Sequence, residues 1–202
     1  MRGLYLVTPD WDDTDRLLAA TGSALEGGAA LVQYRHKTAS DPLRAEQAGA
    51  LLALCRRHGR PLVINDHLDL CLRLDADGVH VGGLDASVAQ VRTALGPDRI
   101  VGASCYGQFA LAEAAQAAGA SYVAFGGFYP SRVKVYEVST SPDIVARAKA
   151  ALRVPVVVIG GMTVENARPL VERGADMVAA ISSVYGAEEP ATAAREFAAL
   201  FS

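Results

Sequence analysis

The sequence GAALVQYR (28–35) recurs in three variants, DADGVHVG (75–82), GASYVAFG (119–126) and GADMVAAIS (174–182). In each, a stretch rich in Ala and Leu ends in Gly or Asp, and a short apolar run follows. Four more apolar runs alternate with these, namely GLYLVTP (3–9), RPLVINDH (60–67), RIVGASCY (99–106) and VPVVVIGG (154–161). Eight short runs separated by amphipathic stretches predict an α/β fold, a (β/α)8 TIM barrel with its active site at the C-terminal ends of the strands.

The stretches between these runs have the ends expected of helices, because Ser, Thr, Asp or Pro precedes several of them and Gly follows several. We predict helices at 14–26, 43–58, 67–74, 87–95, 108–118, 143–152, 163–173 and 190–200. A long polar connection at 129–142 follows the sixth strand, and such a loop in a compact barrel is typical of a functional lid. The sequence has no linker or low-complexity tract, so we expect a single TIM-barrel domain over 1–202.

Composition narrows the class of partner. The chain has 202 residues and a net charge of −3, which argues against nucleic acid or an anionic membrane as the main partner. Its three cysteines have no CxxC spacing, as in a cytoplasmic protein with free buried thiols. No run approaches the length of a membrane span, and MRGLYLVTPD (1–10) predicts a strand rather than a signal peptide. We expect a cytoplasmic monomer or homodimer that acts on small molecules.

Three polar residues end the second predicted strand. Gln33, Arg35 and Lys37 alternate with Tyr34 and His36, so their side chains should leave the same face of the strand. At the C-terminal end of a barrel strand that face looks into the mouth of the barrel. One amide and two cations converging there suit a phosphate or diphosphate, whereas a solvated strand end with chance alternation is the alternative.

Acidic residues follow the next two strands. Asn65 and Asp66 end the third, and Asp85 lies just beyond the fourth. Two carboxylates at adjacent strand ends can share one Mg²⁺ with the oxygens of a bound diphosphate. Helix capping is an equally good interpretation, since both aspartates precede predicted helices, and the two roles can coexist.

The last two strands carry a different signal. Gly160-Gly161 ends the seventh, and 180–183 (AISS) ends the eighth. In many barrels these loops bind a phosphate through backbone N–H groups. In the long connection, Lys134 with Ser131 and Arg132 could close over a charged ligand, although a solvated lysine is the commoner case. We expect His80 to be a structural residue rather than a general base.

Together these positions resemble the thiamine phosphate synthase family over nearly the whole chain. The motifs are QYRHK (33–37), INDHLDL (64–70), ADGVHVGGLD (76–85), GAS (102–104), YVAFGGFYPSRVK (122–134), VIGGMTVEN (158–166) and AAIS (179–182). The resemblance implies a transferase that joins a hydroxymethylpyrimidine diphosphate to a thiazole phosphate, or to its carboxylated form. Thiamine phosphate and pyrophosphate would be the products of an Mg²⁺-dependent, dissociative reaction. Early carbon–oxygen cleavage would leave a pyrimidinylmethyl cation for the thiazole nitrogen to capture.

The resemblance also implies roles for individual residues. The pyrimidine diphosphate would be held by Gln33, Arg35, Lys37, Asn65, Ser104 and Lys134, and the metal by Asp66 and Asp85. The thiazole phosphate would be held by Ser131, Arg132, Val133, Gly161, Ile181 and Ser182. We also predict substrate contacts for Tyr34 and His36, and catalytic roles for Arg35, Lys37 and Lys134.

Two departures from the family pattern stand out. The motif T-x-T-K reads Ser131-Arg132-Val133-Lys134, which lacks the second hydroxyl, and Gly83 replaces the usual Gln. Other hypotheses are a thiazole tautomerase of the same barrel family, which would need no metal, and a non-catalytic thiamine phosphate sensor. A sugar-phosphate epimerase matches only at the ends of the seventh and eighth strands.

Overall fold

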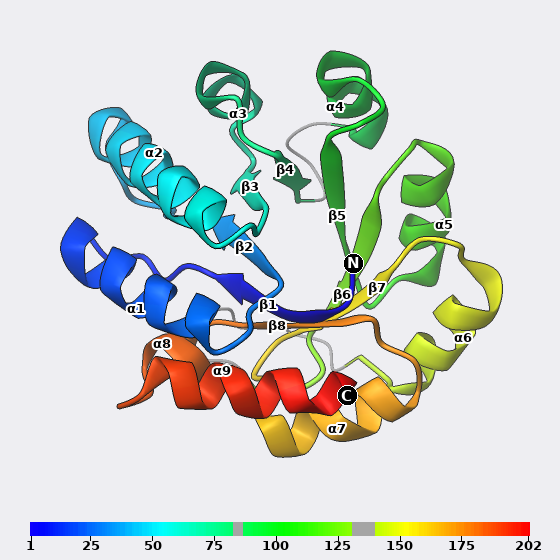
Figure 1. Cartoon of the computed structure of the whole chain (residues 1–202). Helices are drawn as coiled ribbons and strands as arrows, with labels where there is room; N and C mark the ends of the chain where they lie inside the picture. Colours follow the sequence, from blue (N-terminus) through cyan, green and yellow to red (C-terminus); the bar gives the residue numbers. More distant parts are fainter. Residues whose placement is uncertain (83–86, 131–139) are drawn as a thin grey trace.

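The computed structural model describes residues 1–82, 87–130 and 140–202. Its eight parallel strands pair in chain order, and β1 also pairs with β8, so the sheet closes into a barrel. The helices surround this barrel (Figure 1). The strands are β1 Gly3–Val7, β2 Leu31–Tyr34, β3 Leu62–Asn65, β4 Gly78–Val81, β5 Ile100–Tyr106, β6 Tyr122–Gly126, β7 Val156–Ile159 and β8 Met177–Ala180. The predicted TIM barrel is confirmed.

The helices fall within a few residues of the predicted ranges. They are α1 Thr14–Glu26, α2 Asp41–Arg57, α3 Leu68–Leu74, α4 Val88–Leu95, α5 Phe109–Ala117, α6 Asp143–Ala151, α7 Val164–Glu172, α8 Ser182–Tyr185 and α9 Pro190–Ala198, followed by the 3-10 turn η1 Ala199–Phe201. The second helix begins earlier than predicted because Ser40 caps it and Pro42 occupies its first turn. The short helix α8 was not predicted, since four residues are too few to show a helical period.

Two layers of apolar side chains build the core. Between the strands and the helices lies a large cluster in which Leu17, Leu51, Val91, Val145 and Phe197 are each no more than 1% exposed. Inside the barrel lies a second cluster, made of Tyr5, Val7, Leu31, Val63, Tyr122, Ala124, Val157, Met177 and Ala179. This inner cluster fills the barrel and forms the floor of the space at the strands' C-terminal ends.

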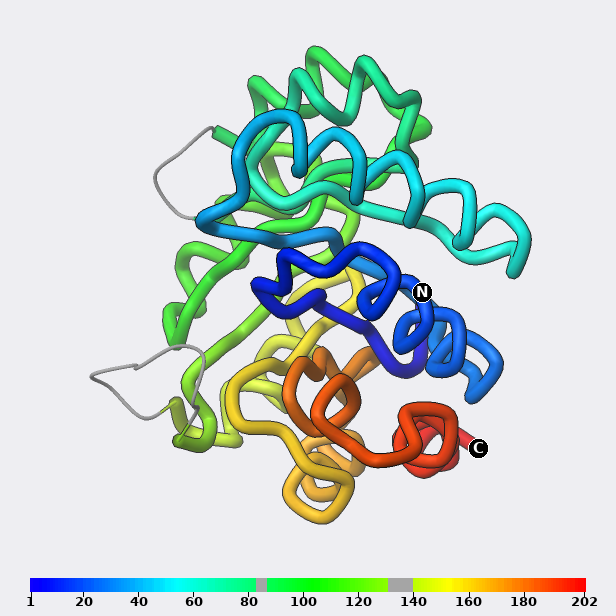
Figure 2. Tube along the Cα trace, turned by 90° about the vertical axis from the view of Figure 1, so that its left-hand side faces the viewer, coloured from blue at the N-terminus to red at the C-terminus, as the bar shows by residue number. Residues whose placement is uncertain are grey.

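The two chain termini lie at the same end of the molecule, on the right in Figure 2. Since β1 begins at Gly3, this is the end at which the strands start. Their C-terminal ends point to the opposite side, as the barrel requires. Among the described residues, every helix is too short or too polar to cross a membrane.

The close approach of β4 to β5 gives a stability prediction. A Cβ at Gly78 would overlap the carbonyl oxygen of Ile100, so Gly78→Ala should destabilise the fold by about 1–3 kcal/mol through overpacking. In the control Gly49→Ala, on α2, the new Cβ would lie 3.8 Å from Leu74. That control should be neutral or stabilise by about 0.5–1 kcal/mol. Urea unfolding measures both, and equal stabilities would contradict the prediction.

Candidate functional site

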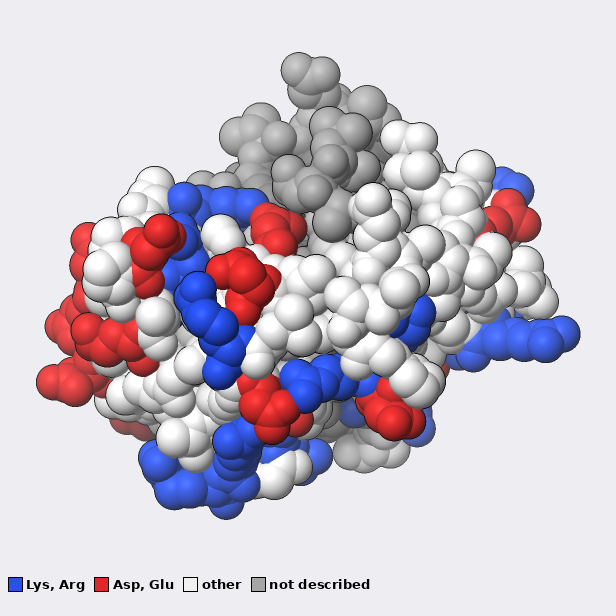
Figure 3. All heavy atoms as spheres, turned by 90° about the horizontal axis from the view of Figure 1, so that it is seen from above, with Lys and Arg blue, Asp and Glu red and all other residues white. Residues whose placement is uncertain are grey.

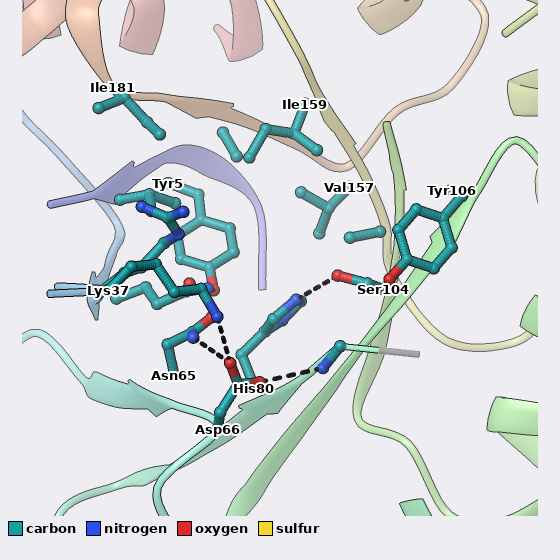
Figure 4. A pocket seen from close by; sticks show the side chains of 16 residues that line it. Tyr5, Lys37, Asn65, Asp66, His80, Ser104, Tyr106, Val157, Ile159 and Ile181 are labelled. Carbon is teal, nitrogen blue, oxygen red and sulfur yellow. Dashed lines mark hydrogen bonds and ion pairs between the residues drawn. The ribbon is translucent and has the colours of Figure 1, made fainter. Parts of the chain in front are cut away.

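A pocket of about 250 Å³ opens at the C-terminal ends of the strands (Figure 4). Its two sides differ in chemistry. Strands β2 to β5 supply amide, cationic, carboxylate, imidazole and hydroxyl groups, whereas β6 to β8 supply aliphatic side chains. The lining residues are Tyr5, Val7, Gln33, Arg35, Lys37, Asn65, Asp66, His80, Gly82, Ser104, Tyr106, Ala124, Val157, Ile159, Ala179 and Ile181. Such a pocket suits a ligand with one polar, anionic part and one apolar part.

The predicted alternation after β2 occurs in the structure. Gln33, Arg35 and Lys37 all line the pocket. Tyr34 and His36 leave the other face of the strand: the Tyr34 hydroxyl donates to Oε1 of Gln47 at 3.0 Å, and His36 Nε2 lies 3.1 Å from Asp12 Oδ1. The structure therefore does not bring the side chains of Tyr34 and His36 to this pocket, and we leave them out of the proposed site.

Asp10 contacts two of the predicted site residues, Arg35 and Lys37, and was not predicted from the sequence. The Arg35 guanidinium, in a residue only 8% exposed, donates through Nη1 to both Asp10 carboxylate oxygens at 3.2 and 3.3 Å. The backbone N–H of Lys37 donates to Asp10 Oδ1 at 2.9 Å. The Thr8 hydroxyl also donates to the Arg35 carbonyl at 2.8 Å. The turn after β1 thus contacts the segment that carries both predicted cations. The polar residues that end this strand, TPD (8–10), are the feature of the sequence that could have predicted this contact.

Asp66 lies where the prediction places it, beside the cations. Its Oδ2 accepts from Lys37 Nζ at 2.7 Å and from Asn65 Nδ2 at 2.6 Å, and its Oδ1 accepts from the Gly82 N–H at 3.3 Å. Helix α3 instead has His67 as its N-cap residue, with no side-chain capping bond. The capping interpretation of Asp66 is therefore wrong. Its backbone has a left-handed φ of 62°, and such strain in a non-glycine residue is typical of functional sites.

The chemistry around Asp66 fits a hard divalent cation. Burial raises the pKa of this carboxyl. The hydrogen bond and charge of Lys37, together with the Gly82 N–H, lower the pKa by more than burial raises it, so the net pKa lies below the usual value. An ionised carboxylate facing an anion pocket is the kind of ligand that Mg²⁺ takes together with water and phosphate oxygens. Within the described residues there is no cluster of three or more His, Cys, Asp or Glu that could hold a metal.

The lowered pKa of Asp66 gives a testable result. Since its folded-state pKa lies below the reference value of 3.8, the carboxylate adds stability above about pH 3.8, and this is lost as pH falls through the folded pKa. Lys37→Met should raise the pKa of Asp66, because the effect of burial would be less opposed. Carboxyl NMR titration of the ligand-free protein measures this. Lys149→Met, which removes the partner of Asp176, is the control and should leave Asp66 unchanged; a similar pKa in Lys37→Met would contradict the prediction.

The ends of β7 and β8 form a second, smaller recess. Its lining includes Gly160, Gly161, Ile181 and Ser182, and it shares Ile159, Ala179 and Ile181 with the main pocket. Both glycines have positive φ, and a Cβ on Gly161 would overlap the backbone of Pro130. Glycine is therefore required for this close approach. The structure brings together the segments that were predicted to bind phosphate.

Several predicted residues lie outside the described part of the chain. These are Asp85, Ser131, Arg132, Val133 and Lys134, together with Gly83. Helix α4, which follows Asp85, is capped by Ser87 in a capping box with Gln90. A capping role for Asp85 is therefore not needed to begin that helix.

The remaining lining residues come mostly from positions that the sequence analysis did not select. Ser104 lines the pocket as expected, but so does His80, whose Nε2 lies 2.8 Å from the Ser104 hydroxyl. Tyr5 and Tyr106 also face the pocket, and Tyr106 has a left-handed φ of 51° at the irregular end of β5. For His80 a signal was available in the sequence, because the period of two in a strand puts it on the same face as Gly82, which also lines the pocket.

Known proteins resemble this chain over its full length. A family model described as thiamine monophosphate synthase matches residues 4–184. The thiamine-phosphate synthase of Janthinobacterium sp. (strain Marseille) is 65% identical over 201 residues, covering 100% of this chain and 97% of that protein. The thiamine-phosphate synthase of Nitrosospira multiformis is 47% identical, and the match covers 98% of this chain and 85% of that protein. The solved structure of thiamine phosphate pyrophosphorylase from Pyrococcus furiosus has 31% sequence identity and a TM-score of 0.85. The match covers 98% of this chain and 95% of that chain.

Proposed function

Because this chain belongs to the thiamine monophosphate synthase family, we propose that it joins 4-amino-2-methyl-5-(diphosphooxymethyl)pyrimidine to a thiazole phosphate. The products are thiamine phosphate and pyrophosphate, so the chain acts as a transferase. One observation carries the proposal: Arg35, Lys37 and Asp66 converge on one side of a pocket whose other side is aliphatic. That arrangement suits a diphosphate attached to a flat, weakly polar ring.

The reaction balances without a protein nucleophile. The bond between the methylene carbon and the diphosphate oxygen breaks, and its electron pair leaves with pyrophosphate. The thiazole nitrogen then donates its lone pair to the pyrimidinylmethyl cation and forms the new carbon–nitrogen bond. Arg35 and Lys37 stabilise the charge that develops on the departing diphosphate, which is the main electrostatic demand of such a step. The aliphatic side of the pocket, including Val157 and Ile159, limits the access of water to the cation.

Asp66 is our proposed protein ligand for Mg²⁺, with Asp85 as the second. When bound, Mg²⁺ would neutralise negative charge on the diphosphate. Asn65 orients the Asp66 carboxylate through its 2.6 Å hydrogen bond. Lys37, which contacts the same carboxylate oxygen, keeps it ionised.

The second recess is our proposed site for the phosphate of the thiazole. Gly161, Ile181 and Ser182 line it, and it is continuous with the main pocket through three shared residues. The two phosphate-bearing substrates would then lie side by side, as the reaction requires. From the family resemblance, we propose that Ser131, Arg132 and Val133 complete this site and that Lys134 contacts the diphosphate. The carboxylated thiazole remains an alternative substrate.

Pyrophosphate release tests the proposal. The purified protein is incubated with both substrates and Mg²⁺, and with each substrate alone. We expect pyrophosphate and thiamine phosphate in equal amounts only when both substrates and Mg²⁺ are present. Folded protein without turnover would overturn the proposal. Metal-independent isomerisation of the thiazole would instead identify a tautomerase, and tight binding of thiamine phosphate without turnover a sensor.

We further propose a cytoplasmic enzyme that acts on small molecules as a monomer or homodimer. Cys55, Cys71 and Cys105 are buried and unbridged, which suits a reducing compartment. Basic and acidic side chains are interspersed on the face shown in Figure 3. This mixed surface, with a net charge of −3, suits a small-molecule enzyme better than a protein that binds nucleic acid or membranes.

A further inference from the structure

Five side chains from five strands form a continuous hydrogen-bonded row across the floor of the pocket. Gln33 Nε2 donates to the Tyr5 hydroxyl at 2.5 Å, and the Tyr5 and Tyr122 hydroxyl oxygens are 2.6 Å apart. His80 Nδ1 lies 2.8 Å from the Tyr122 hydroxyl, and His80 Nε2 lies 2.8 Å from Ser104 Oγ. We call these five residues the Gln33–Ser104 network. Figure 4 shows its His80–Ser104 end.

The network is buried inside the barrel. Tyr5, Tyr122, Gln33 and His80 are each no more than 6% exposed. The Tyr122 ring stacks on His80 with an interplanar angle of 21° and meets the Tyr5 ring edge-on at 84°. Gly102 leaves room for the Tyr122 ring, which a Cβ there would overlap. The packing therefore holds the hydroxyl groups in place, and only the positions of their hydrogens remain to be set.

Those positions are coupled from one end to the other. Gln33 donates to Tyr5. In the arrangement that gives each phenol one donor and one acceptor partner, Tyr5 donates to Tyr122 and Tyr122 donates to His80 Nδ1. A neutral imidazole that accepts at Nδ1 carries its hydrogen on Nε2 and donates it to Ser104 Oγ. The Ser104 hydrogen is then directed toward the pocket. At the other end, Gln33 turns its carbonyl oxygen away from Tyr5.

The phenols are suited to this task. Burial raises the pKa of Tyr5, although its hydrogen bonds to Tyr122 and Gln33 oppose the effect. Burial, reinforced by Tyr5, raises the pKa of Tyr122 as well. Both hydroxyl groups therefore keep their hydrogens at neutral pH. Each buried hydroxyl can pass the direction of hydrogen bonding from one neighbour to the next.

We propose that the Gln33–Ser104 network determines which form of the pyrimidine ring is accepted, with Tyr5, Tyr122 and His80 as positioning residues. The inference rests on the proposed function. A 4-aminopyrimidine offers an N–H donor and a ring-nitrogen acceptor, which match a Gln33 carbonyl and a Ser104 hydroxyl donor. A 4-oxopyrimidine reverses both groups, so it would bind well only if all five members reversed together. Because of this coupling, the hydrogen bonds from Gln33 and Ser104 to the ring select between the two pyrimidine forms together rather than separately.

The test compares equilibrium binding of the 4-aminopyrimidine diphosphate and its 4-oxo analogue by calorimetry. Mg²⁺ is present and thiazole phosphate is omitted, so no turnover occurs. The wild-type protein should prefer the amino compound. Tyr122→Phe interrupts the network between Tyr5 and His80, and the ratio of the two dissociation constants should fall about tenfold. Tyr5→Phe interrupts the adjacent link and should give the same change, which covers a failure of Tyr122→Phe to fold.

Tyr185→Phe is the matched control. It also deletes a buried phenol oxygen, but that hydroxyl lies 3.0 Å from Thr21 in the outer layer. Its substrate preference should equal that of the wild type. Equal weakening of both ligands in Tyr122→Phe, or no wild-type preference, would overturn the network while leaving the proposed function intact. Wild-type protein that releases no pyrophosphate from the amino substrate with thiazole phosphate would overturn both.

Discussion

Asp66→Asn is expected to lower kcat/KM for pyrophosphate release by about 10²–10³-fold, and to remove the stability that the ionised carboxylate adds above about pH 3.8. The substitution keeps the shape of the side chain but removes the charge that faces Lys37 at 2.7 Å. It also replaces the proposed metal ligand by a weaker neutral one. Pyrophosphate release is measured over a range of Mg²⁺ concentrations, and the variant should need more Mg²⁺ for half-maximal activity.

Asp69→Asn is the matched control for this result. Asp69 lies three residues further along, on α3, where its carboxylate pairs with Arg73 on the surface. Such exposed pairs contribute little to stability, about 0–1 kcal/mol. The control should therefore retain wild-type turnover and Mg²⁺ dependence. A kcat/KM within a few fold of wild type in Asp66→Asn would contradict the proposed role of this carboxylate.

Arg35→Gln is expected to lower kcat/KM by about 10²–10³-fold, because it removes a fixed positive charge from the departing diphosphate. The loss should appear mainly in kcat, since the charge on the leaving group grows in the transition state. Inhibition by added pyrophosphate should weaken as well, because the product occupies the same cationic site. Initial rates with and without pyrophosphate measure both effects.

Arg44→Gln provides the comparison. Its guanidinium donates to the Ala39 carbonyl at 2.7 Å at the start of α2, so it is a structured arginine that does not line the pocket. Thermal unfolding of both variants is needed, because Arg35→Gln leaves the Asp10 carboxylate without its guanidinium partner. If Arg35→Gln loses activity only in proportion to its loss of folded protein, a direct role of Arg35 in charge stabilisation is ruled out.

Much of the site was predictable because strand geometry is local. In a strand, residues two apart share a face, which is why Gln33, Arg35 and Lys37 were expected to converge and do. The same rule should have excluded Tyr34 and His36, whose side chains the structure turns to Gln47 and Asp12. Those two residues lie in QYRHK (33–37), all five positions of which were predicted to contact substrate.

Other features depended on contacts that no local pattern contains. Asp10 meets Arg35 because β1 pairs with β2, and pairing brings the turn after one strand beside the end of the next. Asp66 was compatible with a helix cap or a metal ligand, and only the fold shows that α3 begins without it. The same residue types at the same spacing served both interpretations, so the sequence left the choice open.

The barrel, the order of its strands and the strand ends that carry charge follow from patterns within the chain, because periodicity, caps and parallel crossovers are local or nearly so. Which side chains meet across the barrel depends on the assembled fold. Tyr5 and Tyr122 are 117 residues apart in the chain, yet their hydroxyl oxygens lie 2.6 Å apart. Closure of the sheet and the room left by Gly102 place them there. Such a contact depends on all eight strands being present at once.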